Sequence, residues 1–283
     1  MKTKKLFLDG KLVDAKKELL ESLAPGVVRG DGVFETMRVK EGRIFVLENH
    51  LERLFRGLRI LNIKSPYSRK RLEQRLYGIV RANGYREARM RLAVWKNKKQ
   101  VHTAIVCQKI REVDGFTNRQ GIKAVISSVR RCRTRYSHIK SLDYLCFRNA
   151  YVEALERGCD EAILLNSRNK IVEGSRANIF FVKGGILYTP AVGCGCLNGI
   201  TRRIVMRQAR RLGIPCQVVF ADVNRLLEAD EAFVTNALMG VMPLVWVNGR
   251  AIGGGKAGPI TGKLRKAYRT KLQLSCPANG KSV

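Results

Sequence analysis

The stretch SHIKSLDYL, residues 137–145, places a lysine where it could act as a nucleophile. Lys140 lies between the apolar residues Ile139 and Leu142, just before a helical pattern, and three arginines lie upstream at positions 131, 133 and 135. A lysine becomes nucleophilic when burial or neighbouring cations lower its pKa. The position alone also fits a solvated surface charge, so further motifs must decide.

Two other motifs supply an acid and an anion site. In IVEGSRANIFFV (171–182), Glu173 ends a predicted strand before a Gly-Ser turn. In LNGITRR (197–203), Gly199 leads into a predicted helix start, whose free amides and dipole bind anions. A lysine, an acidic partner for a pyridinium nitrogen and a phosphate site are what pyridoxal 5′-phosphate (PLP) requires. A turn-capping acid and an ordinary helix cap are the alternatives.

The elements that hold these residues are predicted from apolar periodicity. A hairpin turning at Asp9-Gly10 is expected at 6–13. Further strands in the first part are expected at 32–39, 88–95 and 101–110, and helices at 48–63 and 68–83. In the second part, strands are expected at 122–129, 161–166, 171–174, 177–182 and 186–188, and helices at 144–157, 199–214 and 261–272.

This order predicts an α+β, or mixed α/β, fold in two domains, because hairpins are many and helices do not alternate regularly with strands. Turn residues cluster at 111–121. We therefore expect a small N-terminal α/β domain at 1–112, a linker at 113–120, a larger C-terminal domain at 121–272, and a loose tail at 273–283.

Charge and composition limit the classes of function. The chain has 54 Lys and Arg against 23 Asp and Glu, a net charge of +31, which would suit a basic nucleic-acid-binding protein. No nucleic-acid-binding motif accompanies the charge, so we favour faster capture of a small anionic substrate over nucleic-acid binding. No apolar run approaches the length of a membrane span, no signal peptide is evident, and no cysteine spacing suits a metal. We expect a cytoplasmic protein without a metal.

Taken together and in order, the motifs resemble the fold-type IV PLP enzymes, or class IV aminotransferases. The resemblance runs from about residue 5 to residue 270. The motifs that carry it are GDGVFETMRV (30–39), HLERL (50–54), IKSLDYL (139–145), EGSRANIFFV (173–182), YTP (188–190), LNGITR (197–202) and TNALMGVMP (235–243). It implies PLP as cofactor, a two-domain fold like that of D-amino-acid aminotransferases, and a homodimer.

The resemblance also implies roles for single residues. Lys140 would bind PLP covalently and shuttle a proton, Glu173 would hydrogen-bond the pyridine nitrogen, and Arg53 would bind the phosphate. The backbone amides expected to complete the phosphate site are those of Ile200, Thr201, Ala237 and Leu238, while Asn178 would be structural. The candidate substrate contacts are Phe34, Arg91 and Arg29. A solvated helix charge is the alternative for Arg53, and a solvent-facing strand residue is the alternative for Arg91.

Three activities occur in the family: branched-chain aminotransferase, D-amino-acid aminotransferase and 4-amino-4-deoxychorismate lyase. IKSLDYL resembles the D-amino-acid aminotransferase and lyase branches, and TNALMGVMP looks most like the lyase, which releases pyruvate to give 4-aminobenzoate, a folate precursor. We therefore expect the lyase, with an aminotransferase acting on branched-chain or D-amino acids and 2-oxoglutarate as the alternative. The short loop KNKKQ (96–100), Arg29 and Asp143 depart from the lyase pattern.

Overall fold

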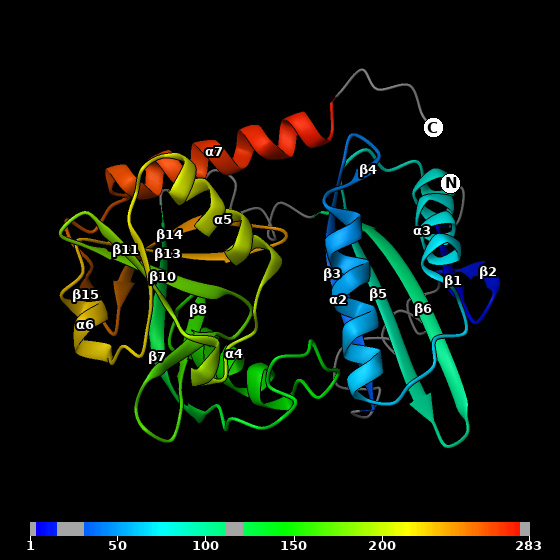
Figure 1. The fold of residues 1–283 in the computed structure, drawn as a ribbon, viewed down its shortest axis with the longest axis horizontal. Helices are drawn as coiled ribbons and strands as arrows, with labels where there is room; N and C mark the ends of the chain where they lie inside the picture. Colours follow the sequence, from blue (N-terminus) through cyan, green and yellow to red (C-terminus); the bar gives the residue numbers. More distant parts are fainter. Residues whose placement is uncertain (1–3, 16–30, 111–120, 278–283) are drawn as a thin grey trace. The chain divides into compact units, whose positions relative to one another are not determined.

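The computed structural model describes residues 4–15, 31–110 and 121–277. The chain forms two compact units, and each unit is discontinuous in sequence. Unit 1 comprises Met1–Glu112, Ile139–Tyr144 and Leu272–Val283, and unit 2 comprises Val113–His138 and Leu145–Lys271. Figure 1 shows one sheet with its own helices in each unit. The expected linker, 113–120, lies outside the described residues.

Unit 1 is built on a six-stranded sheet in the order β2-β1-β6-β5-β3-β4. Its strands are β1 (Lys5–Leu8), β2 (Lys11–Asp14), β3 (Gly32–Lys40), β4 (Arg43–Ile44), β5 (Ala88–Asn97) and β6 (Gln100–Lys109). The hairpin of β1 and β2 turns at Asp9 and Gly10, which both have positive φ, as the sequence predicted. Two helices, α2 (Leu47–Ile60) and α3 (Arg69–Asn83), contact the strands.

The two faces of this sheet differ in chemistry because side chains alternate along each strand. One face of β3 carries Val33, Glu35, Met37 and Val39, all buried, and α2 contacts this strand. The other face carries Phe34 and Thr36, whose antiparallel partners on β5 are Ala93 and Arg91. Glu35 is therefore an acid at a core position, and Phe34 lies on the opposite face.

A short segment from the second half of the sequence completes unit 1. Residues Ile139–Tyr144 were expected in the C-terminal domain, but they belong to unit 1 because they pair with β3. Val33 and Ser141 form an antiparallel bridge across more than a hundred residues of sequence. Local periodicity carries no signal for such a distant pairing.

Unit 2 contains a nine-stranded sheet in the order β12-β11-β10-β13-β14-β7-β8-β9, with β15 paired to β14. The strands are β7 (Ile122–Arg130), β8 (Glu161–Leu165), β9 (Ile171–Gly174), β10 (Asn178–Lys183), β11 (Ile186–Pro190), β12 (Cys216–Val219), β13 (Glu231–Asn236), β14 (Gly240–Val247) and β15 (Arg250–Ala251). Most pairs are antiparallel, but β7 runs parallel to both β8 and β14, and β11 runs parallel to β12. The sheet is therefore mixed, as the fold class requires.

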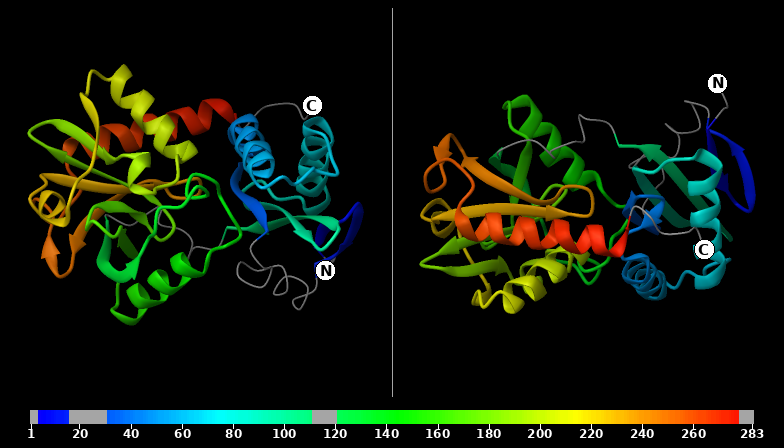
Figure 2. Two further views of the ribbon diagram at one scale, coloured as in Figure 1. Left: turned by 60° about the horizontal axis from the view of Figure 1, so that its bottom comes forward. Right: turned by 90° about the horizontal axis from the view of Figure 1, so that it is seen from above.

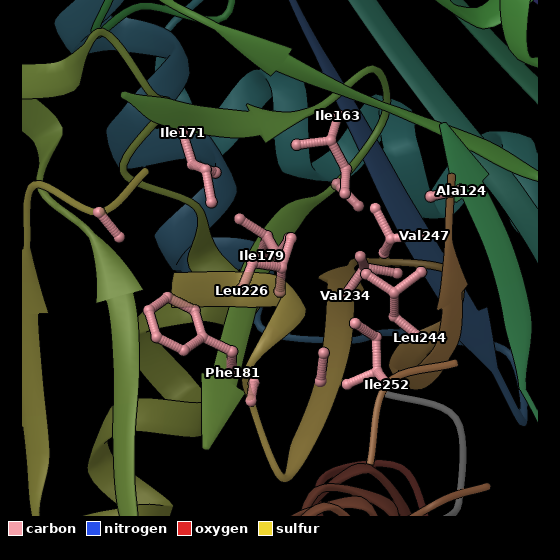
Figure 3. Close-up of a cluster of buried hydrophobic side chains, with 14 of the residues drawn as sticks. Ala124, Ile163, Ile171, Ile179, Phe181, Leu226, Val234, Leu244, Val247 and Ile252 are labelled. Carbon is pink, nitrogen blue, oxygen red and sulfur yellow. The ribbon is translucent and has the colours of Figure 1, made fainter. Parts of the chain in front are cut away.

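The helices of unit 2 are α4 (Leu145–Glu156), α5 (Ile200–Arg211), the short α6 (Val223–Leu227) and α7 (Pro259–Ser275, whose last four residues belong to unit 1), with a 3₁₀ turn, η2, at Val192–Cys194. Figure 2 shows α5 and α7 in two further views. The main core of unit 2, drawn in Figure 3, gathers apolar side chains from several strands, among them Ile163, Ile179, Phe181, Val234 and Leu244. This core fixes the strand ends from which the functional loops start.

The C-terminal end differs from the expected loose tail. The last helix continues to Ser275, and Cys276 is buried with its thiol 3.8 Å from the carbonyl oxygen of Arg43. Residues 278–283 lie outside the described residues. Across the described part of the chain, no helix combines the length and the apolar character needed to span a bilayer.

Candidate active site

Lys140 is held in place by backbone pairing with β3. The amide of Phe34 donates to the carbonyl oxygen of Lys140 at 3.0 Å, and the amide of Leu142 donates to that of Gly32 at 3.0 Å. A side chain at Gly32 would not fit, because a Cβ there would lie 2.6 Å from the Val94 oxygen and 2.7 Å from a Leu142 methyl. The lysine therefore lies on a strand-like support and not on a free loop.

The ring of Phe34 carries two cations. The Lys140 amine lies 4.5 Å and the Arg91 guanidinium 4.4 Å from its centroid. Such cation–π contacts hold a cation without neutralising it. Tyr144 meets the same ring edge-on at 5.6 Å, so the amine has an aromatic wall beside it.

Arg91 is buried with two of its nitrogens unsatisfied. Its side chain is 9% exposed, and neither Nε nor Nη2 has a hydrogen-bond acceptor in the described structure. Burial and then the charge of Arg89 lower the pKa of Arg91 to about 10. Buried guanidinium donors without acceptors cost free energy unless an anion binds them. The solvent-facing alternative for Arg91 is therefore excluded, and the group fits a carboxylate.

Arg53 is also buried and not a solvated helix charge. Its Nε and Nη2 donate to the two oxygens of Glu35 at 2.7 and 2.6 Å, and Nδ1 of His50 lies 2.6 Å from Glu35 Oε2. Burial acts to raise the pKa of Glu35, but the charge and hydrogen bonds of Arg53, aided by His50, lower it to about 2. The phosphate role expected for Arg53 stays a prediction.

In unit 2, Glu173 is fixed by donors from a neighbouring loop. The amide of Leu197 lies 3.2 and 3.1 Å from its two oxygens, and Asn178 Nδ2 donates to Oε2 at 3.2 Å. The side chain is 5% exposed on strand β9. A carboxylate held by several donors favours its charged form, which is the form that a pyridinium nitrogen needs.

Asn178 links Glu173 to the start of α5. Its Nδ2 also donates to the Leu197 carbonyl oxygen at 2.8 Å. Its Oδ1 lies only 2.0 Å from where a Cβ on Gly199 would stand, so a side chain at position 199 would force Asn178 to move. These contacts give the structural role expected for Asn178 a physical basis. The spacing of Asn and Gly in the sequence carries no signal of this contact.

The first turn of α5 offers amides without intrahelical acceptors. Its N-cap, Gly199, contributes no side-chain hydrogen bond, and Ile200 and Thr201 are buried. Buried amides at a helix start need an acceptor, and a phosphate supplies one. Arg202 stabilises the loop by donating to Thr189 Oγ1, the Pro190 oxygen and Asn198 Oδ1 at 3.3, 3.1 and 3.2 Å.

The loop after β13 has a different hydrogen-bond pattern from the one expected. Asn236 Oδ1 accepts from the amides of Leu238 and Met239 at 3.0 and 2.8 Å. This Asx turn fixes the loop, but it already uses the Leu238 amide. Ala237 and Leu238 remain predicted phosphate contacts, with the Leu238 amide bonded to Asn236 in this structure.

Each unit thus gathers one set of predicted residues. Unit 1 brings together Lys140, Phe34 and Arg91, with Arg53 on the buried face of β3. Unit 2 brings together Glu173 and the start of α5. Arg29, an expected substrate contact, lies outside the described residues. The uncapped buried helix start, the anchored carboxylate and the supported lysine fit the three chemical parts of PLP.

A family model described as "Amino-transferase class IV" matches residues 32–246, which is most of the chain. The chain belongs to the class IV aminotransferases. Members of this family are PLP-dependent enzymes of mixed α/β fold, and this class IV protein is therefore a PLP-dependent enzyme of fold type IV.

Relatives and solved structures agree over nearly the full length. A branched-chain-amino-acid aminotransferase of Pseudomonas aeruginosa is 33% identical over 280 residues, covering 93% of this chain and 91% of the relative. An aminodeoxychorismate lyase of Bacillus subtilis is 28% identical, covering 95% and 94%.

Two solved structures are similar in fold throughout. A branched-chain aminotransferase of Thermoproteus uzoniensis, solved with norvaline, has a TM-score of 0.86 at 34% identity, covering 98% of this chain and 96% of that one. A branched-chain amino acid aminotransferase of T.th., solved with pyridoxamine 5′-phosphate, has a TM-score of 0.86 at 29% identity, covering 99% and 96%. Both likenesses extend over the two units of this class IV chain.

Sequence reasoning missed Glu35 and His50, which surround Arg53. The alternation of GVFETMRV was a usable signal, because it places Glu35 on the same side as Val33, Met37 and Val39. An acid at a core position of a strand requires a buried partner. Helical periodicity places His50 and Arg53 one turn apart on α2, where both can face that acid.

Proposed function

We propose that this class IV enzyme is an aminotransferase that takes the amino group from a branched-chain amino acid and passes it to a 2-oxo acid. The observation that carries the proposal is the pair of cations on the Phe34 ring. The Arg91 guanidinium, with Nε and Nη2 lacking acceptors, and the Lys140 amine lie on the same ring, at 4.4 and 4.5 Å from its centroid. An amino acid presents a carboxylate that Arg91 can bind and an α-proton that Lys140 can remove.

The side chains beside this pair suit an apolar substrate. Phe34, Ala93 and Leu142 form a small buried cluster, with Trp95 and Tyr144 packed against it. A branched aliphatic side chain would bury its surface against such groups, while its carboxylate binds Arg91. Phe34 would be both support for the cations and wall for the substrate.

The residues that would hold PLP come from both units. When bound, PLP supplies an electron sink for negative charge at the α-carbon of the amino acid. Lys140 would hold the cofactor covalently and then move the α-proton on Nζ. The Glu173 carboxylate would accept a hydrogen bond from the pyridine nitrogen. Arg53 and the amides of Ile200 and Thr201 would bind the phosphate, and Ala237 and Leu238 complete the predicted set.

The similar proteins favour the aminotransferase over the lyase that the motifs suggested. The Pseudomonas relative and both solved structures carry the name branched-chain aminotransferase, at 29–34% identity. The aminodeoxychorismate lyase relative, at 28% identity, keeps the lyase as the second candidate. Its anionic substrate would also suit the net charge of +31, through faster encounter.

The need for an amino acceptor distinguishes the two candidates. An aminotransferase gives no continuous turnover unless a 2-oxo acid is supplied, and it shows ping-pong kinetics. Purified enzyme should transfer from leucine, isoleucine or valine to 2-oxoglutarate. Continuous release of pyruvate from aminodeoxychorismate with no acceptor, and no transfer from these amino acids, would instead establish the lyase.

The assignment of Lys140 is tested chemically. Borohydride reduction of the enzyme with PLP, followed by peptide mass mapping, should place the pyridoxyl group on Lys140. A label on a different lysine would refute the site while leaving the family membership intact.

The homodimer that the family resemblance implies is tested by light scattering coupled to size-exclusion chromatography.

A further inference from the structure

We propose that Glu35 and His50 are positioning residues, which hold the Arg53 guanidinium so that one edge stays available for the phosphate of the cofactor. This inference rests on the proposed function, in which Arg53 binds that phosphate. It concerns an acid on β3, Glu35, and a histidine on α2, His50, to which the family resemblance assigned no role.

The geometry fixes the guanidinium along one edge. Arg53 donates from Nε to Glu35 Oε1 at 2.7 Å and from Nη2 to Oε2 at 2.6 Å, a two-point fork. A planar guanidinium bound in this way cannot rotate. Among the residues that the structure describes, none bonds to Nη1, so this nitrogen remains for another acceptor.

His50 fixes the acid in turn. Its Nδ1 lies 2.6 Å from Glu35 Oε2, the oxygen that already accepts from Arg53 Nη2. Burial lowers the pKa of His50, which favours the neutral ring, and an ionised Glu35 requires a proton on Nδ1. The imidazole is therefore a donor that keeps the carboxylate plane aligned with the fork.

Stability alone is a poor reason for this cluster. Glu35 is fully buried, and His50 and Arg53 are 2% and 6% exposed. Burying charges costs several kcal/mol, and apolar residues of similar volume are often as stabilising. The rest of this interface is apolar, with Leu51, Leu54 and Leu58 on α2. A charged cluster kept in such a place points to a task for the guanidinium that an apolar residue cannot perform.

The ligand pair PLP and pyridoxal separates positioning from general support, because pyridoxal lacks only the phosphate. We expect Glu35→Gln to weaken PLP binding about tenfold, the scale of one charge-assisted hydrogen bond, and to leave pyridoxal binding unchanged. His50→Leu should shift the PLP-to-pyridoxal affinity ratio in the same direction. His50→Asn, whose amide can replace the Nδ1 donor, should restore it.

The control is Glu231→Gln in unit 2. Glu231 is a buried carboxylate that accepts from the amides of Ile260 and Thr261 at 3.0 and 2.7 Å. Glu231→Gln therefore resembles Glu35→Gln in burial and in the number of hydrogen-bond donors affected. It should lower thermal stability without changing the affinity ratio. Each dissociation constant is measured by absorbance titration of cofactor-free protein, with thermal unfolding recorded for every variant.

Two results would overturn the inference: equal loss of PLP and pyridoxal affinity, or no loss of either, in the Glu35 and His50 variants. If Glu35→Gln does not fold, the His50 pair of variants decides alone. Failure of the proposed function looks different, because the wild-type enzyme would then transfer no amino group from leucine, isoleucine or valine to 2-oxoglutarate. Labelling with a wild-type affinity ratio in all variants would refute only the positioning role.

Discussion

Replacing Glu173 with glutamine tests the role proposed for this carboxylate most directly. The carboxylate accepts the Leu197 amide on both oxygens, at 3.2 and 3.1 Å, and Asn178 Nδ2 on Oε2 at 3.2 Å. Glutamine has one acceptor oxygen and one NH₂ group. Whichever way the amide is turned, its NH₂ group faces one of these donors. At least one charge-assisted hydrogen bond is therefore lost and two donors are brought together.

The magnitude follows from that loss. One charge-assisted bond contributes about 1.5–3 kcal/mol, which corresponds to a fall in Tm of roughly 3–12 °C for a chain of this size. The protein should still fold, because the core of unit 2 does not include this side chain. Turnover should fall at least about a hundredfold, the scale for removing one preorganised electrostatic partner.

The assay compares Glu173→Gln with Glu231→Gln, which loses a similar set of backbone donors without any place in the proposed site. Thermal unfolding of both cofactor-free variants should give similar losses. Only Glu173→Gln should lose kcat in transamination of a branched-chain amino acid. A Glu173→Gln enzyme with near-wild-type kcat would refute the role assigned to this carboxylate.

Three further outcomes are expected. Gly32→Ala should lower the free energy of unfolding by about 1–3 kcal/mol through overpacking, because the added Cβ lies 2.6 Å from the Val94 oxygen. It should also weaken PLP binding by displacing the Lys140 segment. Urea unfolding and a PLP titration measure the two effects. Arg91→Met should leave Tm unchanged or raised, because it removes a buried guanidinium whose Nε and Nη2 lack acceptors, while KM for the amino acid rises at least about tenfold; an unchanged KM would exclude the carboxylate role. Folding lowers the pKa of Glu35 from 4.5 to about 2. The contribution of Glu35 to the free energy of unfolding is therefore complete above pH 4.5 and falls by up to about 3 kcal/mol as the pH drops towards 2. Acid unfolding curves of Glu35→Gln should lack this pH-dependent contribution.

Much of the local structure could be predicted because its causes are local. The Asp9-Gly10 turn could be predicted because this residue pair favours a turn with positive φ at both positions. Helix α3 begins at Arg69 after its Ser68 cap, one residue from the predicted start. The helix around His50 and Arg53 follows from its apolar spacing. The family and its cofactor could be predicted as well, since several motifs recur together in a fixed order.

What could not be predicted depends on pairings across long stretches of sequence. The bridge between Val33 and Ser141, which moves Lys140 into unit 1, leaves no trace in the periodicity of either segment. The fit of Asn178 against Gly199 requires coordinates for both loops. The choice between lyase and aminotransferase stays a prediction, because short motifs shared across one family describe the cofactor site better than the substrate.

The return of the chain to unit 1 at Ile139–Tyr144 bears on how the protein folds during its synthesis. When residues 1–112 have been synthesised, most of unit 1 is present. The strand-like segment that pairs with β3 is still missing, and so is Cys276, which lies beside Arg43. Unit 1 therefore receives its last segment only after most of unit 2 has been synthesised. A nascent chain cut after β6 would have the edge of β3 uncovered and no lysine to place beside Phe34. A fragment of residues 1–112 would lack both Lys140 and Glu173, on which the proposed activity depends.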